Sequence, residues 1–174
     1  MMAKRNRRAR SPGRRTPNVS SLHIILVEPE IHWNTGNIGR TTLAVGADLH
    51  LVEPLGFSLD SRYLLRAGLD YWPRVRVKVW PSWEQIERSL PELGEPFFFS
   101  SQATRLHWDV VYPERVALIF GRESVGLPRP LLERYADRTV RIAMVEPALR
   151  SINLSTSAGI AMFEVMRQWA FAAR

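Results

Sequence analysis

The stretch from Ala117 to Pro128 (ALIFGRESVGLP) constrains the fold more than any other part of this chain. Its first four residues are apolar and lead directly into Gly121, and a second glycine, Gly126, precedes the next helical pattern. This order predicts a buried strand that delivers a tight glycine loop to the start of a helix, the usual place for a ligand in an α/β protein. A P-loop is excluded, because Leu-Pro follows the second glycine where Lys and Ser/Thr are required.

Short apolar or β-branched runs alternate with helical patterns along the rest of the chain. This alternation predicts βαβ units and a single α/β domain with a mainly parallel sheet and helices on both of its faces. The expected strands are Leu22–Val27, Leu49–Val52, Arg74–Trp80, Pro96–Ser101, the run ending at Gly121, and Thr139–Val145. The expected helices follow Asn34–Asn37 and cover Ser58–Ala67, Ser82–Leu90, about 130–136, and Leu154–Ala172.

Two of these elements have unusual patterns. Arg74–Trp80 alternates strictly between basic and apolar residues, which places it at an edge of the sheet. Its charges either prevent the edge strand from pairing with a strand of another molecule or bind RNA. The final helix, Leu154–Ala172, has one narrow polar stripe formed by Glu164, Arg167 and Gln168. A helix that is apolar on most sides is buried on most sides, so we expect it to contact a partner subunit as well as its own core.

The charge of the chain is concentrated at its start. The net charge of the 174 residues is +7, and residues 1–20 contain seven Lys and Arg and no acid, whereas the remainder is balanced. A segment with this composition is predicted to be a disordered basic tail, followed by one domain over residues 21–174. The tail suits the phosphates of RNA or DNA. The alternative interpretation is a solubility tail or a misassigned start codon.

Composition excludes several classes of protein. The chain has no cysteine, so disulfides and cysteine-ligated zinc are excluded, and its four histidines are scattered, which gives a metal site little support. No apolar run approaches the roughly 18 residues that a membrane helix needs, and no signal-peptide core follows the start. The sequence therefore indicates a soluble cytoplasmic protein.

A polar cluster, Asn34–Asn37 (NTGN), precedes the first helical pattern. Such a cluster caps a helix, and its backbone donors also suit an anion. We expect Arg40 in the first turn of that helix, where the helix dipole disfavours a cation. We therefore interpret Arg40 as a residue that serves a ligand rather than the helix.

Three motifs in a specific order and spacing are Asn34–Arg40 (NTGNIGR), Phe120–Leu127 (FGRESVGL) and Arg150–Ser155 (RSINLS). Together they resemble the three motifs of the SpoU-type RNA 2′-O-methyltransferases of the SPOUT superfamily. Two further pieces, Glu28–Glu30 and Arg66–Tyr71 (RAGLDY), resemble its short TrmL branch, which methylates the ribose of the tRNA wobble nucleotide. The resemblance extends over most of the chain, about residues 22–170.

This resemblance implies a C-terminal trefoil knot that forms an S-adenosylmethionine pocket, and a homodimer with tRNA as substrate. It implies transfer of a methyl group to the 2′-hydroxyl of the wobble cytidine or uridine, with S-adenosylhomocysteine as product and no metal. By matching positions, the implied cofactor-binding residues are Phe99, Gly121, Ile142 and Ser151. The implied catalytic residues are Arg40, Glu123 and Asn153.

The roles of these residues leave alternatives open. Because arginine stays protonated in proteins, Arg40 either acts as a general base or fixes a phosphate and stabilises charge on the 2′-oxygen. Glu123 positions Arg40 or an RNA group, or it caps the following turn. Ser151 and Asn153 are also candidates for helix capping, which is compatible with ligand binding.

Other functions compete with wobble methylation. Within the same class, the target is another tRNA site or ribosomal RNA. From a different class, the chain is a knotted RNA-binding factor without catalysis, which need not keep Arg40, Glu123, Ser151 and Asn153 together. A Rossmann-type dinucleotide enzyme is disfavoured, because no G-x-G-x-x-G follows the first strand.

Overall fold

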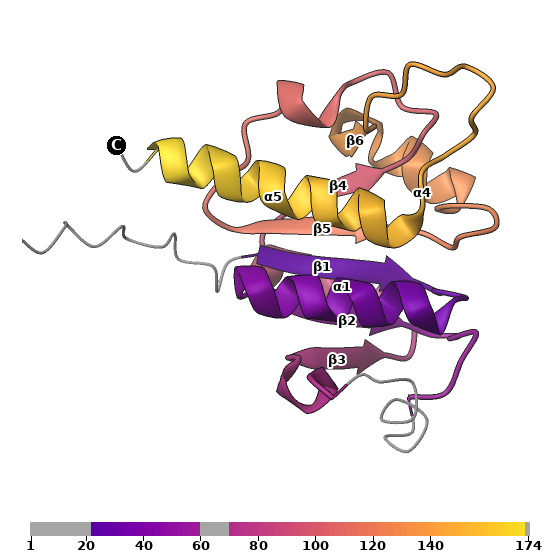
Figure 1. Ribbon diagram of the computed structural model, residues 1–174. Coiled ribbons are helices and arrows are strands. Elements are labelled where there is room, and N and C mark those ends of the chain that lie inside the picture. The colour runs from indigo at the N-terminus through magenta and orange to yellow at the C-terminus, as the bar shows by residue number, and fades with distance from the viewer. Residues whose placement is uncertain (1–21, 60–69, 173–174) are drawn as a thin grey trace, which may run out of the picture.

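A computed structural model describes residues 22–59 and 70–172, which form a six-stranded sheet with the order β3-β2-β1-β5-β4-β6 (Figure 1). All of its strand pairs are parallel. The strands are β1 (Leu22–Val27), β2 (Asp48–Val52), β3 (Val77–Trp80), β4 (Glu95–Phe99), β5 (Val116–Phe120) and β6 (Thr139–Val140). The predicted α/β class with a mainly parallel sheet is confirmed.

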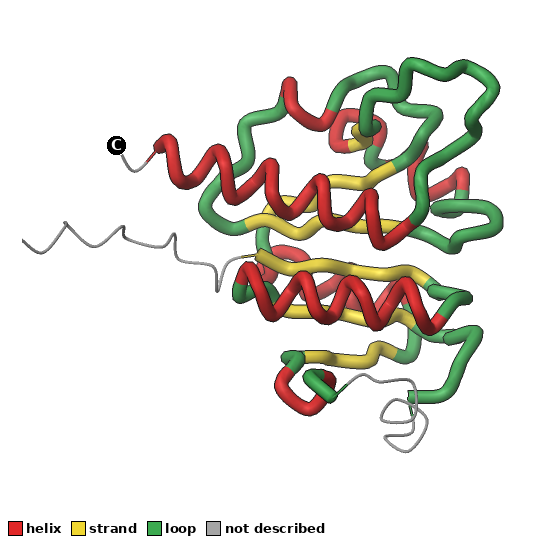
Figure 2. The backbone as a smooth tube through the Cα atoms, in the orientation of Figure 1, coloured by secondary structure: helices red, strands yellow, loops and turns green. Residues whose placement is uncertain are grey.

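Helices cover both faces of this sheet, also as predicted (Figure 2). Helices α1 (His32–Val45) and α5 (Leu154–Ala172) lie side by side on one face, whereas α3 (Trp83–Leu93) and α4 (Arg129–Arg134) cover the other. Because side chains alternate along a strand, β1 serves both cores: Ile24 packs toward α1 and α5, and Ile25 packs toward α3. The described residues also contain three short 3-10 helices, η2 (Trp72–Arg74), η3 (His107–Asp109) and η4 (Ala136–Arg138).

The carboxyl ends of the parallel strands meet at one edge of the sheet. The order of the strands reverses between β1 and β5, which are neighbours although β2, β3 and β4 lie between them in the sequence. In open α/β sheets, ligands bind outside the carboxyl ends of the strands at such a reversal. The loops after β1 and β5 are therefore the first place to look for a site.

Three predicted strands are shorter in the structure, and one of them, predicted over Pro96–Ser101, is β4, which ends at Phe99. The edge position of β3 is confirmed, but the strand begins at Val77 rather than Arg74. The prediction that the last strand extends to Val145 is wrong, because β6 ends at Val140. Its neighbour in the sheet, β4, ends at Phe99, and beyond that point an isolated bridge joins Arg141 to Leu106.

Helix α1 starts earlier than predicted. The helix begins at His32, with Ile31 as an N-cap that makes no side-chain cap hydrogen bond, so Asn34–Asn37 lies inside the helix rather than before it. The prediction that this cluster caps the helix is therefore wrong. Arg40 lies about two turns beyond the helix start, not in the first turn, so the argument from the helix dipole does not apply to it.

The boundaries of α5 are confirmed, whereas its burial is one-sided within the single chain. Ala158, Met162 and Val165 are fully buried, but Ile160 is 38% exposed and Phe163 is 58% exposed. The predicted helix at Ser58–Ala67 falls largely outside the described residues, as does most of Arg66–Tyr71. No helix within residues 22–59 and 70–172 is long and apolar enough to cross a membrane.

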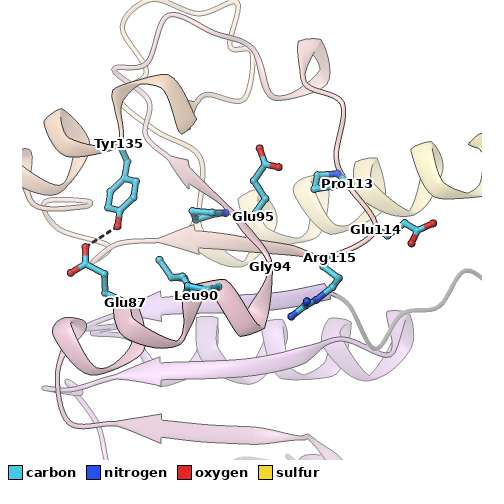
Figure 3. Close-up of a pocket in the computed structure, with 10 residues that line it drawn as sticks. Glu87, Leu90, Gly94, Glu95, Pro113, Glu114, Arg115 and Tyr135 are labelled. Atoms are coloured by element: carbon cyan, nitrogen blue, oxygen red, sulfur yellow. Dashed lines mark hydrogen bonds between the residues drawn. The ribbon is translucent and has the colours of Figure 1, made fainter.

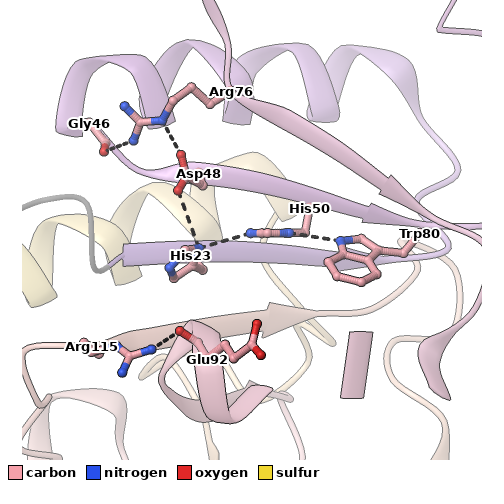
Figure 4. A network of polar contacts seen from close by, with 8 residues as sticks. All are labelled: His23, Gly46, Asp48, His50, Arg76, Trp80, Glu92 and Arg115. Atoms are coloured by element: carbon pink, nitrogen blue, oxygen red, sulfur yellow. Dashed lines mark hydrogen bonds and ion pairs between the residues drawn. The ribbon is translucent and has the colours of Figure 1, made fainter. Parts of the chain in front are cut away.

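A chain of side chains formed by half-buried His23, buried His50 and buried Trp80 connects β1, β2 and β3 (Figure 4). Trp80 Nε1 donates a hydrogen bond to His50 Nδ1 at 3.0 Å, and His50 Nε2 lies 3.1 Å from His23 Nδ1. Because an indole N–H can only donate, His50 Nδ1 must accept, and a neutral His50 carries its proton on Nε2 and donates it to His23. Burial, followed by the nearby His23, lowers the pKa of His50 from 6.5 to about 4.

The histidine pair predicts an acid-dependent loss of stability. The unfolded chain protonates His50 below pH 6.5, but the folded chain does so only near pH 4, so the stabilising contribution is complete above pH 6.5 and declines as the pH falls to about 4. The free energy of unfolding should fall by about 3 kcal/mol over this range. Urea unfolding at several pH values measures it. In His50→Leu most of the slope should disappear, and an unchanged slope would contradict the assignment to His50.

Candidate active site

Three segments come together at the carboxyl edge of the sheet, namely residues 28–31 after β1, residues 121–127 after β5, and residues 150–153 before α5. Each carries one of the three sequence motifs or borders it. The Glu30 N–H donates a hydrogen bond to the Glu123 carboxylate, which joins the first two segments directly. Asn34, in the first turn of α1, hydrogen-bonds to both Glu123 and Asn153 and so joins the third segment to the others. The candidate site is therefore built from parts that are far apart in the sequence.

Glu123 caps the start of α1 from across the site. Its Oε2 accepts a hydrogen bond from the Glu30 N–H at 2.8 Å, and its Oε1 accepts from the Ile31 N–H at 3.3 Å and from Asn34 Nδ2 at 3.0 Å. An acidic group at a helix N-terminus is also favoured by the helix dipole. These contacts include neither Arg40 nor the turn that follows Glu123, and the third alternative, that Glu123 positions an RNA group, stays a prediction.

Asn34 joins the other two motifs to each other. Its Nδ2 donates to Glu123, and its Oδ1 accepts from Asn153 Nδ2 at 2.9 Å. Asn153 in turn uses its Oδ1 to accept the Ser155 N–H at 2.9 Å and the Thr156 N–H at 3.2 Å, which caps α5. Asn153 therefore both caps a helix and belongs to the site.

Asn34 is a site residue that the sequence reasoning missed. It is only 5% exposed, and both ends of its amide are used, so its orientation is fixed. The signal was present as an asparagine inside the first motif, but it was interpreted as part of a cap. We call Glu123, Asn34 and Asn153 the polar relay.

A second set of contacts holds the glycine loop against the end of β1. Glu28 forms an ion pair with Arg122. The Glu30 carboxylate accepts the Ser124 N–H at 2.9 Å and the Ser124 hydroxyl at 2.8 Å. The two acids of the Glu-Pro-Glu segment therefore hold the residues on either side of Glu123, which gives this piece of the sequence a structural purpose.

The glycine loop itself is closed by backbone contacts. The Arg122 N–H donates to the Gly126 carbonyl at 3.2 Å, and the Gly126 N–H donates to the Arg122 carbonyl at 2.9 Å. Gly126 has a φ of 73°, a conformation that glycine adopts without strain. At Gly121 a Cβ would lie 2.2 Å from the Gly126 carbonyl carbon, so no side chain fits there.

Arg40 lies on the exposed side of α1, apart from the three residues of the polar relay. Its guanidinium carbon lies 4.4 Å from the centroid of the Tyr71 ring. The Tyr71 hydroxyl donates to the Gly36 carbonyl at 2.8 Å. Glu123 and Asn153 are thus brought together through Asn34, whereas Arg40 is held separately by Tyr71.

The expected cofactor-binding residues all lie at or just beyond the carboxyl ends of β4, β5 and β6 or before α5. Phe99 and Ile142 belong to the same core cluster as Phe120, which precedes Gly121, and Phe99 stacks on Phe120 with ring centroids 4.6 Å apart. Ser151 is exposed. A pocket of about 400 Å³ lies beside these positions, and its lining residues are Ser101, Gln102, Arg141, Met144, Glu146, Pro147, Leu149 and Arg150.

A larger open pocket of about 760 Å³ lies at the amino ends of the strands, opposite the candidate site (Figure 3). Glu95, the first residue of β4, and Arg115, just before β5, line it, together with Tyr135, whose hydroxyl donates to Glu87 at 2.9 Å. The expected site residues all belong to the described part of the chain, and none of them lines this pocket. Its position at the amino ends of the strands makes it a poor candidate for the active site.

The carboxyl edge presents both polar and apolar surface to a ligand. Within the part of the chain that the structure describes, no group of three or more His, Cys, Asp or Glu could hold a metal ion. The glycine loop offers close approach to backbone, and the adjoining pocket offers polar and apolar walls.

Comparison with known sequences decides the family. Residues 21–163 match the profile of the SpoU rRNA Methylase family, which covers most of the chain. The chain belongs to this family. Within the SpoU family, the tRNA (cytidine(34)-2′-O)-methyltransferase of Saccharophagus degradans is 43% identical over 153 residues, which cover 87% of this chain and 97% of that protein.

Solved structures agree with this assignment. One that concerns the 2-OH methylation of C/U34 on tRNA has 41% identity and a TM-score of 0.79, and the match covers 88% of this chain and 97% of that chain. An AdoMet-bound rRNA methyltransferase from Sinorhizobium meliloti has 25% identity and a TM-score of 0.74, covering 87% of this chain and 57% of that chain. The resemblance to SpoU-type enzymes that the motifs predicted is confirmed.

Proposed function

We propose that this SpoU-family chain is a tRNA 2′-O-methyltransferase that uses S-adenosylmethionine to methylate the ribose of the wobble cytidine or uridine. The observation that carries the proposal is the polar relay, in which one residue from each motif forms a single hydrogen-bonded group at the carboxyl edge of the sheet. The relative that is 43% identical over 87% of the chain carries the name of this activity, which supports the same conclusion.

Methyl transfer from S-adenosylmethionine to a ribose hydroxyl depends more on the alignment of the two groups than on a strong acid or base. S-adenosylmethionine supplies a methyl group that its sulfonium charge already activates. Phe99, Gly121, Ile142 and Ser151 would hold this cofactor, largely through backbone groups. The polar relay fixes the loops around it, so that a ribose 2′-hydroxyl can be held in line with the methyl group, and such orientation supplies much of the rate.

Arg40 is proposed to act on the RNA. Its guanidinium is exposed, and arginine stays protonated in proteins, so a phosphate or a developing negative charge on the 2′-oxygen is a suitable partner. The hydrogen bonds of Glu123 go to Glu30, Ile31 and Asn34, so this role of Arg40 does not depend on Glu123. We favour charge stabilisation over general-base action, because a base would have to lose a proton that arginine retains. As the O–CH3 bond forms, the S–CH3 bond would break to leave S-adenosylhomocysteine, and the proton of the 2′-hydroxyl would pass to bulk water.

The proposal is tested by transfer of a labelled methyl group from S-adenosylmethionine to total tRNA, with mapping of the labelled nucleoside. Label in a 2′-O-methylated wobble nucleotide is the expected result. Label at another tRNA position, or on ribosomal RNA only, would move the target within the same reaction. Cofactor binding without label on any RNA would favour a non-catalytic RNA-binding factor and contradict the proposal.

We further propose that the chain forms a knotted homodimer in the cytoplasm. Gln168 on α5 donates to the Val110 carbonyl at 2.8 Å and accepts the Tyr112 N–H at 3.0 Å, so α5 is fastened to the connection between β4 and β5. The exposed Ile160 and Phe163 on the same helix support a second copy as its partner. Sedimentation of the full chain tests the dimer, and a monomer would contradict it.

Residues 1–20 are proposed to contact RNA phosphates. Seven basic residues and no acid in this segment account for the whole net charge of the chain. Deleting residues 1–20 should weaken tRNA binding and reduce the slope of log affinity against log salt concentration, because fewer counterions are released. Filter binding across a salt series measures the slope. An unchanged slope would assign the segment to another purpose.

A further inference from the structure

Tyr71 touches α1 at two points that are one helical turn apart. Its hydroxyl donates to the Gly36 carbonyl at 2.8 Å, and its ring lies under the Arg40 guanidinium at 4.4 Å from centroid to Cζ. Gly36 is buried, whereas Arg40 is exposed. The tyrosine is therefore anchored at its polar end in the interior and presents its face to the arginine at the surface.

The segment that carries Tyr71 is docked tightly on the same helix. The ring of Trp72 lies so close to α1 that a Cβ at Gly39 would be 2.7 Å from Trp72 Cζ3. Val75, at the end of η2, is buried in the core that α1 covers. The absence of a side chain at Gly39 thus allows η2 to approach α1 and sets the position of Tyr71.

A stacked ring is well suited to order an arginine while leaving donors for a ligand. A cation–π contact uses the flat face of the guanidinium, and the N–H donors in its plane that do not bond the Tyr71 hydroxyl remain available to a phosphate or an oxyanion. Burial raises the pKa of the Tyr71 hydroxyl, so the hydroxyl stays a donor to Gly36. An exposed arginine without such a platform would sample many rotamers.

We infer that Tyr71 is a positioning residue that holds the Arg40 guanidinium in place for the methyl transfer reaction. The inference rests on the proposed function of Arg40. Tyr71 acts through Arg40 and need not touch the RNA or the cofactor. The hydroxyl and the ring have separate tasks, because the first fixes the ring and the second fixes the guanidinium.

The inference is tested with Tyr71→Leu and Tyr71→Phe in the full chain. Tyr71→Leu should lower kcat by about 10- to 100-fold, the scale of a catalytic group displaced by about 1 Å, with unchanged affinity for S-adenosylhomocysteine. Tm should fall in both Tyr71→Leu and Tyr71→Phe, because each variant loses the hydrogen bond to the buried Gly36 carbonyl. Tyr71→Phe keeps the ring and should recover most of kcat. Tyr135→Phe, which removes a tyrosine hydroxyl bound to Glu87 at the far edge of the sheet, is the matched control and should behave as wild type.

A structural role alone would give a different pattern. A loss of kcat in Tyr71→Phe as large as that in Tyr71→Leu would overturn the inference, because it would follow the lost hydrogen bond rather than the lost ring. A weakened cofactor affinity in Tyr71→Leu, in step with the loss of kcat, would also overturn it. So would a full kcat in Tyr71→Leu. In an Arg40→Lys background, where the planar guanidinium is gone, Tyr71→Leu should cost much less than in wild type, and equal losses in the two backgrounds would also contradict the inference.

A readout that needs no reaction separates this inference from the proposed function. The Arg40 Hε proton over the Tyr71 ring should show an upfield ring-current shift in NMR spectra, and Tyr71→Leu should remove it while Tyr71→Phe keeps it. If the wild-type chain methylates no RNA but shows this pattern, the proposed function fails and the placement of Arg40 stands. If the shift is absent from the wild-type spectrum, the placement itself fails.

Discussion

Arg40→Ala should strongly slow methyl transfer to tRNA while binding of S-adenosylmethionine persists. The side chain is exposed and stacks on Tyr71, so its removal leaves the core and the polar relay intact. Loss of one donor to a developing oxyanion typically costs about 10²- to 10³-fold in kcat. Single-turnover transfer measures the chemical step, and calorimetry with S-adenosylhomocysteine measures cofactor binding.

Two further variants sharpen this experiment. Arg129→Ala removes another exposed arginine, which pairs with Glu133 on α4, and should leave the rate unchanged. Arg40→Lys keeps the charge but loses the planar fork, so partial activity would indicate charge stabilisation, and activity as low as that of Arg40→Ala would indicate a need for two aligned donors. Full activity in Arg40→Ala would remove this residue from the mechanism.

The elements that the sequence predicted well are those whose signal is local. β1 is a continuous apolar run closed by Glu28-Pro29, and α5 follows a capping asparagine, so both boundaries could be placed to the residue. The start of α1 could not, because its cap is Glu123, which lies 93 residues from Glu30 in the sequence. The length of β6 was likewise set by a neighbour, since its pairing with β4 stops where β4 itself ends.

The same distinction applies to the candidate site. Arg40, Glu123 and Asn153 were named because their motifs resemble those of a family, and no local pattern assigns them to one another. Asn34 was missed because a polar residue near a helix start has a sufficient explanation as a cap. Its actual partners are 89 and 119 residues away, and only the folded chain brings them to hydrogen-bond distance.

Gly121→Ala should be the most damaging single-methyl substitution in the glycine loop. The added Cβ would lie 2.2 Å from the Gly126 carbonyl carbon and 2.3 Å from the Leu127 nitrogen, both backbone atoms that cannot rotate away. The loop must open, which breaks the pair of hydrogen bonds between Arg122 and Gly126. We expect a loss of about 3 kcal/mol in the free energy of unfolding. Affinity for S-adenosylmethionine should fall with it, because the loop lies at the expected cofactor site.

Two other glycines separate the steric cause from a general effect of replacing glycine. Gly126→Ala meets no atom within 4 Å, but its φ of 73° should cost about 1 kcal/mol. Gly159→Ala, inside α5, also meets nothing and should gain about 0.5–1 kcal/mol through helix propensity. Urea unfolding of the three variants should therefore rank them with Gly121→Ala lowest and Gly159→Ala highest. Gly121→Ala could instead prove as stable as Gly126→Ala and bind the cofactor normally. That result would show that the close contact between Gly121 and the Gly126–Leu127 backbone does not determine the shape of the cofactor site.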